Sequence, residues 1–391
     1  MFLFNEKNCA DICLKNTNKY VFKAVNDLIN DFARVSKYGV KPKIVKTETQ
    51  NCIVIEENAR TSAEPVADES YSITTEDVTK VFADTAPTQL YGDEYDLVPR
   101  EKDGKYGIYY HLQYYGCGPH LVPQTGLKKL YYNMKRAYNK GDTDYFIMNV
   151  SNVREFVFEM KAYAESAWSM DRYSPDEYLS RYCERFGEYA DEVKSTIIDF
   201  YESFPELDSK YLEKHLSTYF NYTKTPPPAG ITDFVLKEGS IIDYGKRMTD
   251  NFDKDLSKWL CHEYAAAIKP VIANSDDICA RFERIVGKLD EPLKTHLKIK
   301  WLLSAKTLNY IYKWYVALHD AKIYRDEYDG ENMKKSILEA CGYLFDYLDY
   351  RKCAEYGEFR NWYRGDLKMN IKQRLYDTLK IIGRTPEMTE S

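Results

Sequence analysis

Polar side chains gather at the ends of two predicted strands, and their types suit ligand binding. Residues 107–116 read GIYYHLQYYG, and residues 144–155 read DYFIMNVSNVRE, where four apolar residues run directly into polar ones. In parallel β/α architectures, ligands are met at the carboxyl ends of the strands. Amides and an imidazole would bind hydroxyl groups there, and a guanidinium would hold a carboxylate through two hydrogen bonds. The candidate ligand-binding residues are Tyr110, His111, Asn149, Asn152 and Arg154.

The same segments also have a structural interpretation, which the sequence leaves open. His111 would then be a half-buried histidine that donates a hydrogen bond to a backbone carbonyl. Because Asn and Ser are favoured at helix N-caps, we expect one of Ser151 and Asn152 to cap the helix that follows. Arg154 would lie in the first turn of that helix. A ligand role and a capping role are therefore both predicted for this stretch.

The acidic and aromatic residues that follow give no catalytic assignment. Glu155 and Glu159 lie on one helix face, but acids are common in the first turns of helices, so we predict a solvated face. Trp168, with Tyr163, is predicted to pack against the strands rather than to form a stacking platform. No Ser/His/Asp or Cys/His arrangement carries a local signature. The catalytic residues are therefore unknown from the sequence.

Composition argues against several classes of protein. The 391 residues carry a net charge of −6, whereas a nucleic-acid binder would need a basic face. No apolar run approaches the roughly 18 residues that span a bilayer, and the first residues lack the basic start of a secretory signal. We therefore expect no nucleic-acid or membrane partner and a cytoplasmic location. The nine cysteines form no CxxC pair, so we expect reduced thiols, no metal site and no cofactor.

The pattern of elements predicts three domains. Residues 1–98 look like a small α/β domain, with a helix over 20–37 and a hairpin over 71–85. Residues 99–154 hold a strand, a helix and a second strand, which make one βαβ unit. Residues 155–391 contain little but helical patterns. The expected fold class is α+β and mostly α, ending in a large helical bundle.

The helical domain is predicted as amphipathic segments around one apolar helix. Ser174, Pro175 and Glu177 form a capping box with proline at the first helical position. Ser275, which precedes two aspartates, is a second expected cap. Residues 294–324 are apolar on most sides, so we place them at the centre of the bundle. Helices are predicted over 188–204, 208–221, 233–269, 276–289, 292–326, 331–356 and 366–382.

The strand–helix–strand segment resembles glycoside hydrolase family 115, the xylan α-glucuronidases. The late barrel segment of that family has a strand with Tyr-Tyr-His, a helix with Met-x-x-Ala-Tyr, a strand with Asn-Val and a helix ending in Ala-Trp. This sequence departs from the family where Gly-Asp is replaced by Ser151-Asn152, Lys by Arg154 and Glu by Val157. The matching residues are Tyr109, Tyr110, His111, Met134, Ala137, Tyr138, Asn149, Val150, Ala167 and Trp168.

The resemblance implies an O-glycosyl hydrolase that acts on uronic-acid side groups of xylan oligosaccharides, with His111 or Arg154 holding the uronate. A (β/α)8 barrel takes about 250 residues, whereas residues 99–154 hold one βαβ unit. We find no pair of carboxylates that could flank a glycosidic bond, so we expect a truncated barrel with weak or no activity. The alternative is a non-catalytic carbohydrate-binding or helical scaffolding protein. The expected partner is a uronate-bearing carbohydrate, and the open strand edges also suggest a homodimer.

Overall fold

The computed structural model divides the chain into two compact units, residues 1–73 and 74–391. The predicted domain boundaries near 98 and 154 stay predictions. The residues that the structure describes are 11–15, 25–26, 29, 41–46, 52–56, 79–85, 88–114, 119–207, 228–229, 231, 234–257 and 259–383.

The first unit contains a parallel sheet. Strand β1 (Asp11–Lys15) lies between β2 (Ile44–Val45) and β3 (Cys52–Glu56), and both neighbours run parallel to it. Parallel neighbours need a crossover connection, in contrast to a tight hairpin. Of the helix predicted over 20–37, the described residues 25, 26 and 29 are helical. The α/β character expected of this part of the chain is therefore present in its described residues.

A second parallel sheet opens the larger unit. Its order is β4 (Thr79–Ala83), β5 (Lys105–His111) and β6 (Tyr145–Asn149). The βαβ unit predicted from the sequence is present, because α3 (Leu127–Lys140) connects β5 to β6. The predicted hairpin is wrong where it included β4, since this strand pairs in parallel with β5. Residues 71–78, its other half, lie outside the described residues.

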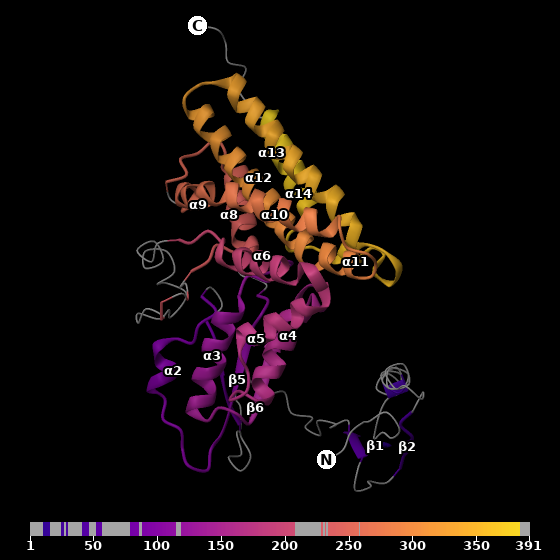
Figure 1. Cartoon of the computed structure of the whole chain (residues 1–391). Helices are drawn as coiled ribbons and strands as arrows, with labels where there is room; N and C mark the ends of the chain where they lie inside the picture. Colours follow the sequence, from indigo (N-terminus) through magenta and orange to yellow (C-terminus); the bar gives the residue numbers. More distant parts are fainter. Residues whose placement is uncertain are drawn as a thin grey trace. The chain divides into compact units, whose positions relative to one another are not determined.

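Helices α3 and α4 (Val153–Trp168) run beside this sheet (Figure 1). Tyr163 on α4 is buried, as predicted, but the prediction that Trp168 packs is wrong, because its side chain is 92% exposed. Residues five positions apart lie about 140° apart around a helix, so the two rings point in different directions. Gly107 lets β5 and β6 approach, because a Cβ there would lie 2.2 Å from the carbonyl oxygen of Tyr145.

Two predicted helix caps had different outcomes. Helix α5 (Pro175–Cys183) begins as expected, with the Ser174 side chain accepting a hydrogen bond from the Glu177 amide. The Ser275 cap is wrong, because Ser275 lies inside α10 (Ile272–Val286). The 3-10 turn η2 (Lys269–Val271) leads straight into α10 from the preceding helix, so the chain has no break at which Ser275 could act.

The remaining elements form the helical part of the larger unit, in which α12 (Leu303–Asp326) is buried on most sides as predicted. The segment predicted as one helix over 233–269 is interrupted after Asp250 and resumes at Cys261. Residues 208–221 lie outside the described residues. The other elements are α2 (Asp93–Leu97), η1 (Glu184–Tyr189), α6 (Ala190–Glu202), α8 (Glu238–Asp250), α9 (Cys261–Ile268), α11 (Leu293–Leu297), η3 (Lys298–Leu302), α13 (Gly330–Tyr350), η4 (Arg351–Ala354), η5 (Gly357–Phe359), η6 (Trp362–Gly365) and α14 (Ile371–Ile382).

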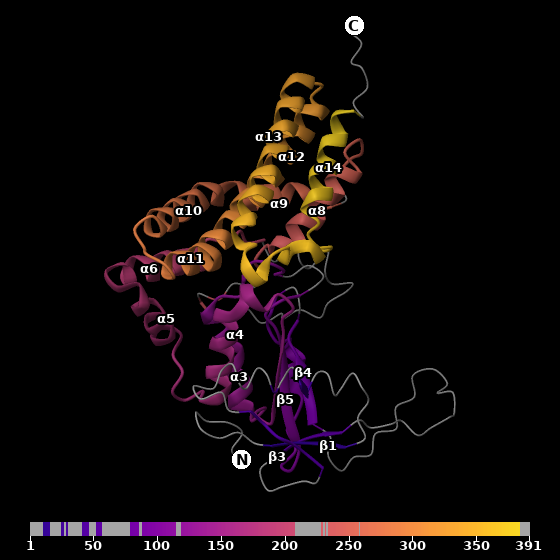
Figure 2. The same ribbon diagram turned by 90° about the vertical axis from the view of Figure 1, so that its right-hand side faces the viewer.

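Large aromatic side chains fill the bundle around α12. Trp301, Trp314 and Tyr315 are all fully buried; α13 packs against α12, and α14 packs against α13 (Figure 2). Helix α8 approaches α12 at Gly245, where an added Cβ would lie 2.2 Å from the Trp314 ring. Glycine is therefore required at this crossing. Within the described part of the chain, no helix combines the length and the apolarity needed to cross a membrane.

Candidate functional site

The carboxyl ends of β4, β5 and β6 lie at one edge of the sheet, as parallel pairing demands. Residue His111, at the end of β5, is in register with Asn149, at the end of β6. On the other side, Asp84 directly follows β4, and its backbone amide donates to the carbonyl of Tyr109. The structure thus brings the predicted His111 and Asn149 together and adds Asp84 to them. Sequence reasoning missed Asp84 because it assigned β4 to the leading domain.

Asp84 and His111 form a buried pair. Asp84 Oδ1 accepts a hydrogen bond from the His111 backbone amide at 3.0 Å and lies 2.6 Å from the imidazole Nδ1. Burial raises the pKa of the Asp84 carboxyl, whereas its contacts with His111 act in the opposite direction. A proton on Nδ1, facing the carboxylate, would leave the Nε2 lone pair as an acceptor. In this tautomer the imidazole keeps one hydrogen-bond acceptor, Nε2.

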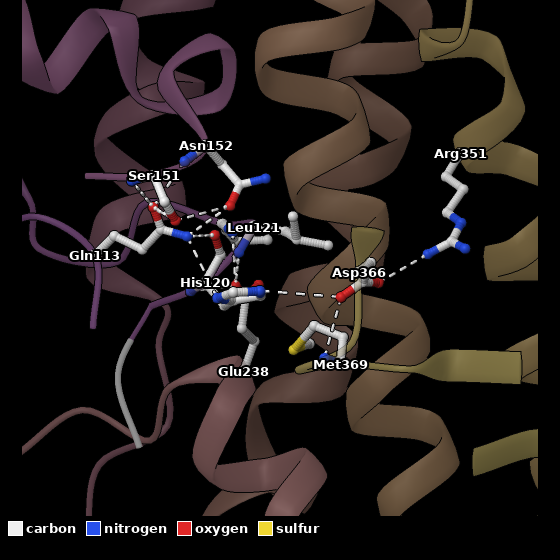
Figure 3. Close-up of polar contacts among 10 residues, drawn as sticks. Gln113, His120, Leu121, Ser151, Asn152, Glu238, Arg351, Asp366 and Met369 are labelled. Atoms are coloured by element: carbon white, nitrogen blue, oxygen red, sulfur yellow. Dashed lines mark hydrogen bonds and ion pairs between the residues drawn. The ribbon is translucent and has the colours of Figure 1, made fainter. Parts of the chain in front are cut away.

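Gln113 holds the start of α4. Its Oε1 accepts from the amides of Ser151 and Asn152 at 2.5 and 2.9 Å, and its Nε2 donates to Asn152 Oδ1 and to the His120 carbonyl, both at 2.7 Å (Figure 3). Asn152 occupies the N-cap position but makes no side-chain cap. The predicted cap by Ser151 or Asn152 is wrong, because no side chain caps the first turn of α4; Gln113 instead binds the amides of the turn that precedes the helix.

Two of the predicted residues have different surroundings at the sheet. Tyr110 is fully buried; its hydroxyl donates to the Gln89 carbonyl at 3.2 Å and accepts from Asn133 Nδ2 at the same distance. Asn149 is half-buried, and its backbone carbonyl accepts from the Gln113 amide at 3.0 Å. Tyr110 therefore supports the strand end from within the core, whereas Asn149 lies at its edge.

Arg154 connects α4 to a segment near the end of the chain. Its guanidinium donates to the Ala354 carbonyl at 2.6 Å and to the Tyr363 hydroxyl at 2.9 Å. It also pairs with Glu155 at 2.8 Å and lies over the ring of Trp362, with its central carbon 4.9 Å from the ring centroid. The donors that a bound carboxylate would need are thus engaged by the protein itself.

The solvated face predicted for Glu155 and Glu159 is wrong. Glu155 Oε1 accepts from the indole nitrogen of Trp362 at 2.9 Å. Glu159 pairs with Lys300 at 2.8 Å, and both side chains are buried. The reason is that the helical part of this unit covers the first turns of α4, which the sequence of α4 alone cannot reveal.

Glu238, another buried acid, binds the loop that follows Gln113. It is the first residue of α8, and its Oε1 accepts from the backbone amides of His120 at 2.5 Å, Val122 at 2.9 Å and Leu121 (Figure 3). Burial raises the pKa of Glu238 to about 8, although the three amides act in the opposite direction. Glu238 therefore binds residues 120–122 to the helices and is largely protonated at neutral pH.

His120 contacts the helical part from the other side of this loop. Its Nε2 lies 3.9 Å from Asp366 Oδ1, and Asp366 Oδ2 lies 3.2 Å from Arg351 Nη1. Burial lowers the pKa of His120, whereas the nearby Asp366 acts in the opposite direction. Among the described residues, no group of three or more His, Cys, Asp or Glu side chains is placed to hold a metal ion. The chemistry open to this edge of the sheet is hydrogen bonding by His111, Asn149 and Asn152.

Comparisons with known proteins find a family model that matches part of the chain. Residues 46–213 match the family model described as glycosyl hydrolase family 115. The comparison with curated proteins gave no match. Twelve solved chains match; one is described as "A novel family GH115 4-O-Methyl-alpha-glucuronidase, BtGH115A, with specificity for decorated arabinogalactans", at 16% identity and a TM-score of 0.46 over 76% of this chain. Another, described as a "GH138 enzyme targeting pectin rhamnogalacturonan II", has 13% identity and a TM-score of 0.38 over 71% of this chain.

The present chain is short relative to these structures. It spans 35% of the length of the first and 48% of the length of the second. Both TM-scores lie below 0.5, so neither likeness assigns a residue role or a reaction to this chain.

Proposed function

We propose that this chain, whose residues 46–213 match the model of glycosyl hydrolase family 115, is a protein of that type that binds uronate-bearing carbohydrate and has negligible hydrolytic turnover. Its ancestral substrates would be the uronic-acid side groups of xylan oligosaccharides. The proposed site is the edge of the sheet at His111, Asn149 and Asn152. Tyr110 and Arg154 would act there as positioning residues, since their polar groups are bonded within the protein.

The Asp84–His111 pair is the observation that carries the binding proposal. It fixes an imidazole at a strand end, where a hydroxyl group can donate to Nε2. The side-chain amides of Asn149 and Asn152, both only half-buried, lie on the neighbouring strand end and the turn after it. Amide and imidazole groups are the polar partners that a sugar ring needs in order to be oriented in a site.

The contacts that the acidic side chains make within the protein support the proposed loss of hydrolysis. Glycosidases use two carboxyl groups that flank the scissile bond, one of them free to protonate the leaving oxygen. Here Asp84 is bound by His111, Glu155 by Arg154, and Glu238 by the 120–122 amides. The second oxygen of each of these three acids is buried as well, so none of them is exposed to protonate a leaving oxygen.

A helical scaffolding protein is the alternative function. The contacts of Arg154 with Ala354 and of Glu238 with Val122 bind the strand ends firmly to the helices, which suits a rigid support as well as a binding site. Ligand binding separates the two functions, because a scaffold has no need of an oriented imidazole.

The test is a calorimetric titration of the full chain with a glucuronic-acid-substituted xylo-oligosaccharide and with its unsubstituted counterpart. We expect binding of the substituted sugar, its loss in His111→Ala, and no release of uronic acid. His262→Ala, which changes an exposed histidine on α9, is the matched control. Multiple turnovers would refute the proposed loss of hydrolysis. Failure of the wild-type protein to bind would favour the scaffold.

A homodimer and a cytoplasmic location are retained as proposals. Strands β4 and β6 are the outer strands of their sheet, and Val81 and Tyr145 on them are exposed. Outer strands offer unpaired backbone groups to another chain. Sedimentation of the purified protein at several concentrations tests the dimer directly.

A further inference from the structure

A hollow of about 520 Å³ lies beside the last turn of α4, at the opposite end of that helix from Asn152. A helix of this length separates its two ends by roughly 20 Å, so the hollow is distinct from the strand-end site. One of its lining residues is Trp168, whose indole is almost fully exposed. The side chains used in the argument below are Lys161, Ala164, Glu165, Trp168, Arg172 and Arg181.

The exposure of Trp168 is unusual for a side chain of its type. Tryptophan buries a large apolar area when it packs, yet 92% of this side chain is accessible, more than for any other exposed large hydrophobic residue described. By contrast, Trp301 and Trp314 of the same unit are buried almost completely. The Trp168 ring therefore presents a flat apolar surface to whatever enters the hollow.

The rim around this ring is predominantly basic, although the whole chain has a net charge of −6. Glu165 is the acid among the lining residues, and it is shared by Arg181 at 2.6 Å and Lys161 at 3.7 Å. The guanidinium of Arg172 has no hydrogen bond or ion pair to any residue in the described ranges. An unused guanidinium with five donors is suited to bind a carboxylate.

We propose that this hollow, the Trp168 hollow, is a second binding site for acidic saccharide, in which a sugar ring lies on the indole and its carboxylate pairs with Arg172. The inference extends the proposed function to a second place on the chain and rests on its ligand class. A sugar ring has an apolar C–H face and a polar edge, so a flat indole inside a charged rim matches both. The volume of the hollow falls in the range of small-molecule sites.

A saccharide fits this hollow better than a protein partner does. The centre of a protein interface is apolar and poor in charged residues. Here the indole is surrounded by Lys161, Glu165, Arg172 and Arg181, and Ala164 is the small neighbour on its own helix face. A protein or a second copy of the chain would have to bury Lys161 and Glu165, residue types that interfaces lack, whereas a sugar leaves them partly in water.

The experiment is a calorimetric titration of the full-length wild-type protein, Trp168→Ala and Arg172→Ala with the substituted and unsubstituted xylo-oligosaccharides. Phe345→Ala, which removes an exposed aromatic ring from α13, is the matched control. We expect two sites in the wild-type protein and one in Trp168→Ala. Arg172→Ala should weaken binding of the acidic sugar at this site at least tenfold and leave any binding of the neutral sugar unchanged.

The outcome separates this inference from the proposed function. A single wild-type site that is lost in His111→Ala and unchanged in Trp168→Ala would overturn the Trp168 hollow and leave the strand-end site standing. A single site with the opposite behaviour would support the hollow and refute the strand-end site. Should Trp168→Ala instead convert a dimer to a monomer in sedimentation, the occupant is a second chain and the saccharide proposal is wrong.

Discussion

The Arg154 guanidinium donates to the backbone carbonyl of Ala354 at 2.6 Å, across 200 positions of sequence. Around this contact, the same side chain lies over the rings of Phe359 and Trp362. One residue in the first turn of α4 therefore binds the end of the helical bundle to the edge of the sheet.

Arg154→Lys should lower the free energy of unfolding. Lysine keeps the charge but loses the planar group that stacks on rings and donates in two directions. We expect a loss of about 1–3 kcal/mol, the scale of one or two hydrogen bonds to a charged group. Urea denaturation measures it, with Arg360→Lys at an exposed position as the control. Equal stability of the two variants would contradict this account of Arg154.

Lys300→Met should destabilise the protein strongly, because it leaves the buried Glu159 carboxylate without its partner. Removing one member of a buried ion pair costs about 3–5 kcal/mol. The double variant Lys300→Met with Glu159→Leu should recover much of the loss. Lys246→Met, which breaks an exposed pair with Asp250, should change the unfolding free energy by less than about 1 kcal/mol. A similar effect of both single changes would be evidence against burial of the Glu159 pair.

Glu238 should make stability depend on pH between its ordinary pKa and its raised one. The folded pKa of about 8 lies above the ordinary value of 4.5, so the native state keeps a proton that the unfolded chain has released. Stability from this group is therefore fully present below about pH 4.5 and declines as pH rises toward 8. Glu238→Gln cannot titrate, so the melting temperature of the wild type relative to that variant should fall over this range. Parallel curves from pH 5 to 8.5 would exclude the effect.

Two glycine-to-alanine changes in helices should have opposite signs. Gly245→Ala puts a Cβ 2.2 Å from the Trp314 ring, and we expect a loss of about 1–3 kcal/mol from overpacking. Gly342→Ala on α13 meets nothing within 4 Å, so it should stabilise by about 0.5–1 kcal/mol through helix propensity. Thermal denaturation of the two variants tests the packing of α8 on α12, and a stabilised Gly245→Ala would contradict it.

Local patterns predicted much of the secondary structure. The capping box at Ser174 marked the start of α5, and helical periodicity marked α3 and the buried helix α12. The strand–helix–strand order predicted the parallel pairing of β5 with β6. In each case the residues that form the pattern lie within the element that they predict or next to it.

The errors come from contacts between distant segments. Nothing in residues 79–83 indicates that they pair with β5 in parallel, and Asp84 was missed for that reason. Gln113, rather than Ser151 or Asn152, fixes the turn before α4, and Glu159, expected on a solvated face, forms a buried pair with Lys300. Trp168 differs, because the helical period alone places it on another face of α4 than the buried Tyr163. Of the candidate site, the sequence thus predicted His111 and Asn149 as neighbours and missed the groups that hold them.

The side-chain amide of Gln113 donates to Asn152, in the turn before α4, and to the His120 carbonyl. His120 belongs to the loop whose backbone amides donate to Glu238 at the start of α8. A molecule that donates to the side-chain oxygen of Asn152 would share that atom with Gln113, whose Nε2 already donates to it at 2.7 Å. Gln113 therefore links the start of α4, through a single loop, to the first residue of α8.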